Sequence, residues 1–380
     1  MAQVPQARRG KGRMANPSVP TVLPKSPEGD RLPGGASPVV VRSFEPDLAA
    51  RWDRFVCGHP GGTLFHLTGW KRVLERNFFY EPRYLYAERN ETISGVAPVF
   101  FISNWVMGRC LLSLPFAAYG GICASDPESE QALLRHLREL AASERVDFLE
   151  LRSRNGELSP GFSSNPRYAT FSAPLDPDHE ANLKRLPRDT RYMIRKAEKA
   201  GLRARNGMDQ LGEFYRLLAL SYQRLGTPVF PRTLFESLAQ EFPDRTDLLV
   251  VYSGDKPVSG VFSFFFRDTV LPYYAGAAPE APSLAANNFM YAELMKQAAA
   301  SGYRRFDFGR SKKGTGAYAF KTQWNMTVES LNYQVHLVGR KTVPNFSPLN
   351  PKFQLATRVW QRLPLWLTTR MGPRVVRWFP

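Results

Sequence analysis

Hydrophobic residues in the first half of the chain recur with the periods of helices and strands, and polar turns separate the runs. Apolar positions at helical spacing predict helices, and alternating or continuous apolar runs predict strands. The expected helices cover residues 46–56, 69–77 and 128–144, and the expected strands cover residues 39–41, 84–89, 94–103, 110–114 and 148–153.

The second half repeats this order of elements. The expected helices cover residues 180–200, 211–225, 232–241 and 287–301, and the expected strands cover residues 248–253, 258–267, 269–274 and 306–309. Each half therefore predicts helices, a hairpin, a further strand, a crossover helix and a last strand. Such an order is typical of an α/β (α+β) fold with a mixed sheet flanked by helices.

Three short matches between the halves indicate an internal duplication. Residues 63–65, 94–96 and 148–153 recur, in order and in similar settings, at 233–235, 259–261 and 306–311, with offsets of 170, 165 and 158. Periodic self-similarity of this kind marks repeated structural units. The alternative is that short strand–turn–strand units resemble one another by chance.

The chain divides into four segments by composition and pattern. Residues 1–38 are rich in Pro, Gly, Ala and Ser and carry several basic residues, so we expect a disordered basic tail. Residues 39–175 and 176–340 are the two expected domains. Residues 341–380 form a basic, amphipathic C-terminal tail.

Charge adds a preference for anionic partners. The 380 residues carry a net charge of +17, which favours polyanions. Residues 351–380 contain six Lys or Arg and no acid, interleaved with aromatic residues, which suits an anionic membrane surface. The alternative is a tail that packs back on the domain. Since no apolar run approaches the ~20 residues of a membrane span, we expect a cytoplasmic protein, peripheral at the inner face of the membrane.

Common cofactor and metal motifs are absent from the sequence. It lacks the dinucleotide-binding, P-loop, zincin and nucleophile-elbow patterns. Three cysteines stand far apart and five histidines form no spaced set. We therefore expect no metal and no permanently bound cofactor.

The string of residues 309–316 combines cations and glycines after a strand. Glycines let main-chain N–H groups approach an anion, and cations attract it, so the string predicts a phosphate or carboxylate cradle. A solvated basic turn is the alternative. The candidate binding residues are Arg310, Ser311, Lys312, Lys313, Gly314 and Gly316.

Two further basic features are candidates for substrate contacts. Lys321 lies among aromatic residues, where an ammonium can stabilise an oxyanion or, alternatively, cover an aromatic surface. Arg188, Arg191 and Arg195 recur on one face of an expected helix, which either meets phosphates or faces solvent.

Three strings resemble the FemAB family: SLPFAAYGG (113–121), RDTRYMIRKAEKAG (188–201) and FDFGRSKKGTGAYAFKTQW (306–324). The branch most similar is the FemAB-like proteins associated with the PEP-CTERM and exosortase system. The resemblance covers about residues 40–340. It implies a tandem duplication of GNAT-like acyltransferase domains, and transfer of an acyl or aminoacyl group to an amine of a peptidoglycan- or exopolysaccharide-related envelope precursor.

The resemblance also implies roles for individual residues. Lys321 falls where bridge-forming members carry a lysine near the reacting carbonyl, and Tyr318 and Asp307 of the same string are further catalytic candidates. Trp70-Lys71 falls near a first-domain lysine that meets substrate phosphate, and Tyr119 is a further binding candidate. The implied co-substrate is an aminoacyl-tRNA or acyl-CoA, the implied acceptor is lipid- or nucleotide-linked, and we expect a monomer.

Two classes of function remain open at this point. One is the acyltransferase, and the other is a non-catalytic basic module that binds anionic polymer or membrane. The enzyme is favoured if Lys321 and the 309–316 string line one cleft between the halves. The module is favoured if the basic groups are spread over convex surface. A nucleic-acid binder would have no recognised motif beyond charge.

Overall fold

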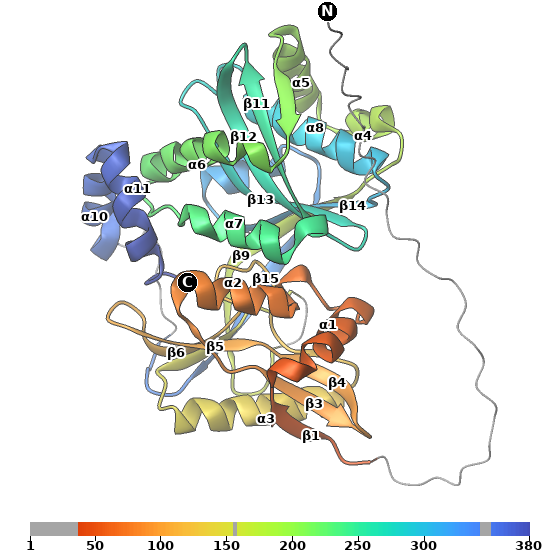
Figure 1. Ribbon diagram of the computed structural model, residues 1–380, viewed down its shortest axis with the longest axis vertical. Helices are drawn as coiled ribbons and strands as arrows, with labels where there is room; N and C mark the ends of the chain where they lie inside the picture. The colour runs from red at the N-terminus through yellow and green to blue at the C-terminus, as the bar shows by residue number, and fades with distance from the viewer. Residues whose placement is uncertain (1–36, 155–157, 343–350) are drawn as a thin grey trace, which may run out of the picture.

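The computed structural model describes residues 37–154, 158–342 and 351–380. Most of the expected tail at 1–38 and residues 343–350 of the C-terminal tail lie outside the described residues. The two halves of the chain lie one above the other, and strands β9 (Ser163–Pro174) and β15 (Thr327–Leu337) run between them (Figure 1).

The first half follows the predicted order of elements. Its expected strand at 94–103 is divided at Pro98: β4 pairs with β3 and β7 in a four-stranded sheet, whereas β5 pairs with β6 in a larger one. Proline has no N–H to donate to a sheet ladder, which accounts for the division. The elements are β1 (Val40–Ser43), η1 (Pro46–Leu48), α1 (Ala49–Gly58), η2 (Leu64–His66), α2 (Thr68–Phe78), β2 (Glu81–Pro82), β3 (Leu85–Arg89), β4 (Thr92–Ala97), β5 (Val99–Asn104), β6 (Gly108–Ser113), β7 (Cys123–Ala124), α3 (Pro127–Ser143) and β8 (Phe148–Leu151).

The second half differs from expectation at several places, and it contains β10 and α9, two elements that were not predicted. The helix expected at 180–200 is interrupted before Pro187, because a residue that precedes proline disfavours the helical conformation and Leu186 is extended. Strand β14 continues to Lys312, so only residues 313–315 separate it from α9. The elements are α4 (His179–Arg185), α5 (Arg188–Lys199), β10 (Arg203–Asn206), η3 (Met208–Gln210), α6 (Leu211–Leu225), α7 (Arg232–Glu241), η4 (Pro243–Arg245), β11 (Thr246–Ser253), β12 (Lys256–Phe266), β13 (Thr269–Ala277), α8 (Ala286–Ala300), β14 (Arg305–Lys312) and α9 (Gly316–Thr322).

Strands β9 and β15 join the two halves into one sheet of eleven strands. Its order is β10-β11-β12-β13-β14-β9-β15-β8-β6-β5-β2. The last strand of each half pairs with the sheet of the other: β9 lies antiparallel to β14, and β15 lies antiparallel to β8. The sheet therefore continues across the expected domain boundary at 175–176.

A repeated contact supports the internal duplication. In both halves a Ser-Gly-Val strand meets the start of the crossover helix. Ser129 in the first turn of α3 donates to Ser94 Oγ at 2.8 Å, and Ser259 Oγ donates to the carbonyl of Ala286, the first residue of α8, at 3.3 Å. The two crossovers also end alike, because β8 is parallel to β6 and β14 is parallel to β13.

Aromatic packing fixes the halves against each other. Trp70 of α2 is fully buried, and its ring lies 5.9 Å from that of Phe264 in β12. Phe65 contacts the same ring at 5.9 Å. Burying a large apolar side chain stabilises a fold by roughly 1.5–3 kcal/mol, so this cluster stabilises the junction of the halves. Trp70, a binding candidate from the sequence, therefore lies in the core.

The C-terminal tail forms two helices that pack against α6. They are α10 (Pro351–Arg362) and α11 (Leu365–Val376), separated at Pro364 (Figure 1). Gly372 of α11 lies so close to Val229 that a Cβ atom would approach its carbonyl oxygen to 2.9 Å. Within the described ranges, no helix combines the length and apolar character that crossing a membrane requires.

Candidate functional site

A cavity of about 640 Å³ opens where two parallel strands separate. Strands β13 and β14 are paired only at Thr269–Arg305 and Val270–Phe306. Beyond these pairs β14 stays with β9, so β13 and β14 diverge. Ala275 of β13 and Arg310 of β14 both line the cavity, as do residues of the first half and of α10 and α11.

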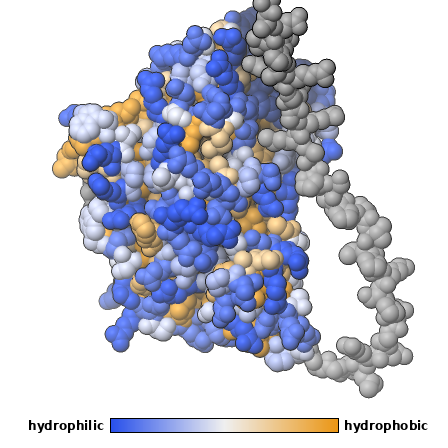
Figure 2. Space-filling view, in the orientation of Figure 1, coloured by the Kyte–Doolittle hydropathy of each residue, from blue (hydrophilic) through white to orange (hydrophobic). Residues whose placement is uncertain are grey.

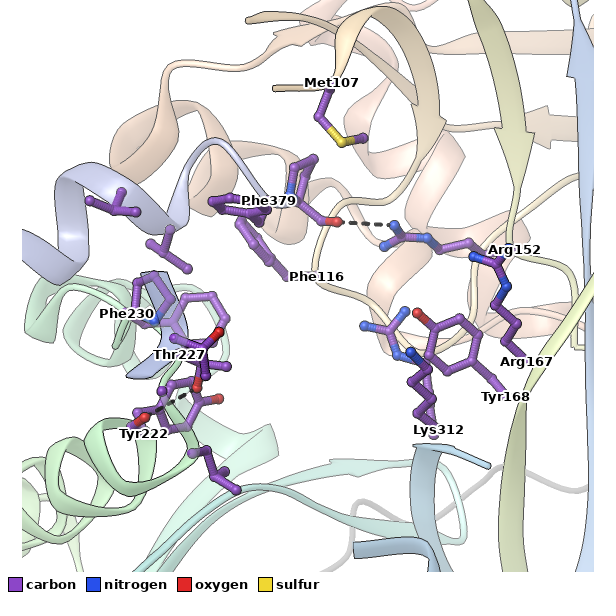
Figure 3. Close-up of a pocket in the computed structure, with 18 of the residues that line it drawn as sticks. Met107, Phe116, Arg152, Arg167, Tyr168, Tyr222, Thr227, Phe230, Lys312 and Phe379 are labelled. Atoms are coloured by element: carbon purple, nitrogen blue, oxygen red, sulfur yellow. Dashed lines mark hydrogen bonds between the residues drawn. The ribbon is translucent and has the colours of Figure 1, made fainter. Parts of the chain in front are cut away.

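The cavity has one basic and one largely apolar wall (Figure 3). The strand ends supply cations to one side of the cavity. Aromatic rings on the other side come from the loop after α6, the 114–122 loop and the C-terminal segment. The labelled basic side contains Arg152, Arg167, Tyr168 and Lys312, and the labelled opposite side contains Phe116, Tyr222, Phe230 and Phe379.

Arg310 is held over two tyrosine rings. Its guanidinium lies 5.0 Å from the ring centroid of Tyr168 and 6.0 Å from that of Tyr333, and it donates to the Tyr333 hydroxyl at 3.4 Å. The Tyr333 hydroxyl in turn donates to the Ala118 carbonyl at 2.7 Å. These contacts position the cation at the cavity wall.

The structure divides the cation–glycine string among different environments. Arg310 and Lys312 line the cavity. Ser311, which alternation turns to the other face of β14, is buried, and its hydroxyl has no hydrogen-bond partner in the described part of the chain. Lys313 is exposed and donates to Ser330 Oγ at 3.1 Å. Gly314, in the turn before α9, and Gly316, the first residue of α9, are also exposed and are not among the residues that line the cavity.

Lys321 contacts the main chain behind Arg310. Its Nζ donates to the carbonyl oxygens of Phe308, Gly309 and Arg310 at 2.6, 3.3 and 3.4 Å. Burial lowers the pKa of Lys321 to about 8; the charge of Asp307 opposes that shift and the charge of Arg310 adds to it. Its ammonium lies near the 309–316 string, but Lys321 is not among the residues that line the cavity.

A second cavity, of about 450 Å³, contains Asp307 and Tyr119. The buried Asp307 carboxylate accepts from the Tyr119 hydroxyl at 2.9 Å, Thr170 Oγ1 at 3.0 Å, Arg154 Nη1 at 3.0 Å and the Gly309 amide at 2.8 Å. Burial, followed by the Asp307 charge, raises the pKa of Tyr119 well above its usual value. This carboxylate is engaged by four donors and ties the halves together.

His66 also lines the second cavity. Burial lowers its pKa to about 4, so it is neutral at physiological pH. In residues 37–154, 158–342 and 351–380, no three His, Cys, Asp or Glu side chains come together as metal ligands would.

Other predicted site residues lie apart from both cavities. Tyr318 of α9 is half-buried against the Phe171 ring at 5.1 Å. Lys71 pairs with Glu75 at 3.0 Å. The α5 arginines lie on a helix that packs against α8 (Figure 1). Arg188 and Arg195 are exposed and Arg191 is half-buried, and none of the three lines either cavity.

Sequence reasoning missed several residues that line the larger cavity. Arg152, Arg167, Tyr168 and Tyr333 were not candidates, although Arg152-Ser153 matches Arg310-Ser311 in the repeat. That match was the available signal.

Comparisons with known proteins agree with this architecture. Residues 184–322 match the family model described as an acetyltransferase (GNAT) domain. A search of curated proteins found no match. Among solved structures, FemX matches with a TM-score of 0.61 and 16% identity, over 84% of this chain and 100% of its own.

Two further solved structures are also similar. The C-terminal domain of a putative lysylphosphatidylglycerol synthetase from Agrobacterium fabrum has a TM-score of 0.52 and 11% identity, over 77% of this chain and 92% of its own. L-PGS from Bacillus licheniformis has a TM-score of 0.50 and 12% identity, over 84% of this chain and 98% of its own. At these identities the likeness concerns the fold.

The predicted fold class is confirmed: mixed sheets flanked by helices in a tandem GNAT-like arrangement. Residues 184–322 match a GNAT acetyltransferase domain, and the chain as a whole resembles the fold of FemX, a FemAB-family protein.

Proposed function

We propose that this protein is an N-acyltransferase that transfers an acyl or aminoacyl group to an amine of a cell-envelope precursor. The observation that carries the proposal is the position of the larger cavity. It opens where β13 and β14 diverge, and both strands belong to the segment that matches the GNAT acetyltransferase domain. The FemAB-like strings support an acceptor related to peptidoglycan or exopolysaccharide and the PEP-CTERM and exosortase-associated branch.

The divergence of the strands suits acyl transfer. An attacking amine converts the acyl carbonyl into a tetrahedral oxyanion, which collapses as the donor's leaving group departs and the amine loses a proton to substrate or water. Beyond Val270, β13 is not paired with β14, and we propose that main-chain amides of this edge, other than that of Ala277, which donates to Ser221 Oγ at 2.8 Å, polarise that carbonyl. The donor would be a co-substrate, either an aminoacyl-tRNA or an acyl-CoA.

Lys321 contributes to this site by positioning β14. An ammonium carries three N–H donors, and the carbonyls of Phe308, Gly309 and Arg310 accept all three. Direct stabilisation of the oxyanion, the role implied by the sequence, would require Nζ to leave these carbonyls. We therefore propose Lys321 as a positioning residue that sets the direction of Arg310.

The C-terminal helices support action at a membrane surface. Their outer face carries Leu355 and Trp366, whose exposed fractions are 73% and 67%. Figure 2 shows apolar side chains at this edge of the molecule, where α10 and α11 lie in Figure 1. Together with the arginines of this acid-free segment, they suit the inner, anionic leaflet, where each basic residue gains about 1 kcal/mol.

The non-catalytic basic module is favoured less. Its cations would face solvent on convex surface, as Arg188 and Arg195 of α5 do. Arg310 and Lys312, by contrast, line a cavity between the halves. A module that only binds surface charge has no use for such a cavity.

A transfer assay tests the proposed function. The purified protein is mixed with a donor, either acetyl-CoA or charged tRNA, and with an acceptor, either a UDP-linked muramyl peptide or an amino sugar. The products are identified by mass spectrometry. Ala275→Trp, which fills the cavity, should abolish transfer, whereas Ala200→Trp on the exposed end of α5 should not. Failure of every donor–acceptor pair, or equal activity of the two variants, would overturn the proposal.

A further inference from the structure

Large aromatic side chains of the first half stand exposed beside the C-terminal helices. Trp105 and Phe79 are each 77% exposed. Trp105 lies in the turn between β5 and β6, and Phe79 directly follows α2. The tip of the β5–β6 hairpin and the two C-terminal helices lie at the same edge of the molecule, on the left in Figure 1. A contact surface at this edge therefore includes more than α10 and α11.

Direct contacts join these exposed rings to the end of α11. The Trp105 ring lies 5.5 Å from the ring of Trp378, edge to face. A groove of about 280 Å³ lies between the two segments and is lined by Phe79, Arg377 and Trp378. Beside it, the Tyr80 hydroxyl donates to the Arg377 carbonyl at 2.7 Å. We call the continuous surface that results the aromatic edge, and its rings are Phe79, Trp105, Trp366 and Trp378.

The turn that carries Trp105 is held in one conformation. The side-chain oxygen of Asn104 accepts from the main-chain amides of Val106 and Met107, each at 2.9 Å. Arg340 donates to the Met107 carbonyl at 2.9 Å. Trp105 therefore projects into solvent from a fixed turn. An anchor that is already ordered loses little conformational entropy when it binds.

Phe79 combines exposure with an unfavourable backbone conformation. It ends α2 with φ 59° and ψ 31°, in the left-handed region. Glycine or asparagine usually occupies this position, because a bulky side chain there is strained. The Phe79 ring is mostly exposed, so core packing does not account for its presence. Strain together with exposure indicates a contact outside the chain.

The charge around the aromatic edge selects an anionic partner. Residues 99–113 and 351–380, which meet at this edge, contain no acid. Glu81, a carboxylate of the groove, pairs with Arg83 at 2.9 Å. Five exposed arginines of the C-terminal segment have no salt bridge to a described carboxylate: Arg358, Arg362, Arg370, Arg374 and Arg377. A second copy of the chain would bring like charges together, which disfavours a dimer through this edge.

We propose that the aromatic edge lies in the interface of an anionic bilayer, so that both halves of the protein contact the membrane at once. Tryptophan is enriched at the interface between lipid and water, and arginine pairs there with lipid phosphates. Met107 in the hairpin turn and Trp360 of α10 both line the larger cavity, so the cavity adjoins this surface. The orientation rests on the membrane contact proposed above for α10 and α11, whereas the contact of the first half is additional.

The experiment measures flotation of the full chain with vesicles of phosphatidylglycerol and phosphatidylcholine. The variants are Trp105→Glu and Phe79→Asn, and the control is Tyr192→Glu, which changes an exposed ring on α5. We expect the vesicle partition coefficient to fall at least about tenfold for Trp105→Glu and severalfold for Phe79→Asn, with no change in the control. Vesicles of phosphatidylcholine alone should bind the wild type weakly.

Phe79→Asn separates membrane contact from folding. Asparagine tolerates the left-handed conformation, so the melting temperature of this variant should stay the same or rise while its flotation falls. A purely structural role of Phe79 predicts no loss of flotation. The Asn variant also keeps the test valid if Trp105→Glu disturbs the hairpin.

Other outcomes assign the aromatic edge differently. If Trp105→Glu and Phe79→Asn float like the wild type while Leu355→Glu and Trp366→Glu do not, the contact is confined to α10 and α11 and this inference fails. Sedimentation velocity adds a second check, since a wild-type dimer that Trp105→Glu dissociates would mean that a second copy covers the edge. Flotation that persists in a protein that transfers to no acceptor would remove the proposed function and leave the membrane surface in place.

Discussion

The hydroxyl of Tyr119 lies 2.9 and 3.0 Å from the two carboxylate oxygens of Asp307, across the junction of the two halves. Tyr119 comes from the loop after β6, and Asp307 comes from β14. Arg154 reinforces the contact, since its guanidinium donates to Asp307 and lies 4.8 Å from the Tyr119 ring centroid. Asp307 lies three residues before Arg310, which lines the larger cavity. The contact with Tyr119 therefore also positions β14.

Tyr119→Phe should destabilise the protein without unfolding it. The substitution removes one donor from a buried carboxylate, and hydrogen bonds to charged groups contribute roughly 1.5–3 kcal/mol. Urea denaturation should show a loss of that size in the free energy of unfolding. Tyr192→Phe, at a tyrosine that is 66% exposed on α5, serves as the control and should change stability by less than about 0.5 kcal/mol. Equal losses in both variants would argue against the junction.

The pKa of Lys321 should make its contribution to stability depend on pH. The pKa is about 8 in the folded protein and 10.5 in the reference state, so the unfolded chain holds the proton more tightly. Folding is therefore penalised while the group is charged below pH 8, and the penalty is relieved as pH rises from about 8 to 10.5. At about 1.4 kcal/mol per pKa unit, the relief amounts to roughly 2–3 kcal/mol.

The measurement compares the wild type with Lys321→Met. Other titrating groups cancel when the free energies of unfolding of the two proteins are subtracted at each pH. The wild type should gain stability relative to the variant between pH 8 and 10.5. A difference that stays flat over this range would mean that the ammonium is not desolvated in the folded state.

Lys321→Met should also act on substrate binding more than on the chemical step. Loss of its hydrogen bonds to β14 frees the segment that carries Arg310, so KM should rise roughly tenfold or more, given about 1.5–3 kcal/mol for hydrogen bonds of a charged group. Lys313→Met, at the exposed neighbour that contacts Ser330, should leave both constants unchanged. A fall of about 10²–10³ in kcat at constant KM would instead assign the oxyanion to Lys321.

Local patterns predicted most helices and strands but not the strands that unite the halves. The helices at 128–144 and 211–225 were found within a residue because caps and apolar spacing are local. The breaks at Pro98 and Pro187 were readable from proline itself. In strand β15, the buried residues Leu331, Tyr333 and Val335 alternate with more exposed ones, which is a local pattern typical of a strand.

Strand β9 is harder to predict for a physical reason. Its sequence contains Pro166 and many polar residues, and its pairing partners lie more than 130 residues away in β14 and β15. The same exchange of strands brings Arg152 and Arg310 together. A candidate site that depends on such non-local pairing cannot be assembled from periodicity, although the repeat did place the two arginines at equivalent positions.

Point substitutions on the outer face of the C-terminal helices should weaken binding to anionic vesicles. Deleting 351–380 would expose α6 and remove part of the cavity wall, so it cannot separate membrane binding from folding. Leu355→Glu and Trp366→Glu instead alter exposed positions and place acids in a segment that has none. In flotation with phosphatidylglycerol vesicles both should lose binding, and wild-type binding should fall with added salt because charges are screened over about 8 Å at physiological ionic strength. Tyr192→Glu on α5 should float like the wild type, since the proposed contact does not include that helix. Flotation that neither acid substitution reduces would remove α10 and α11 from the membrane contact and leave them as helices that only close the cavity.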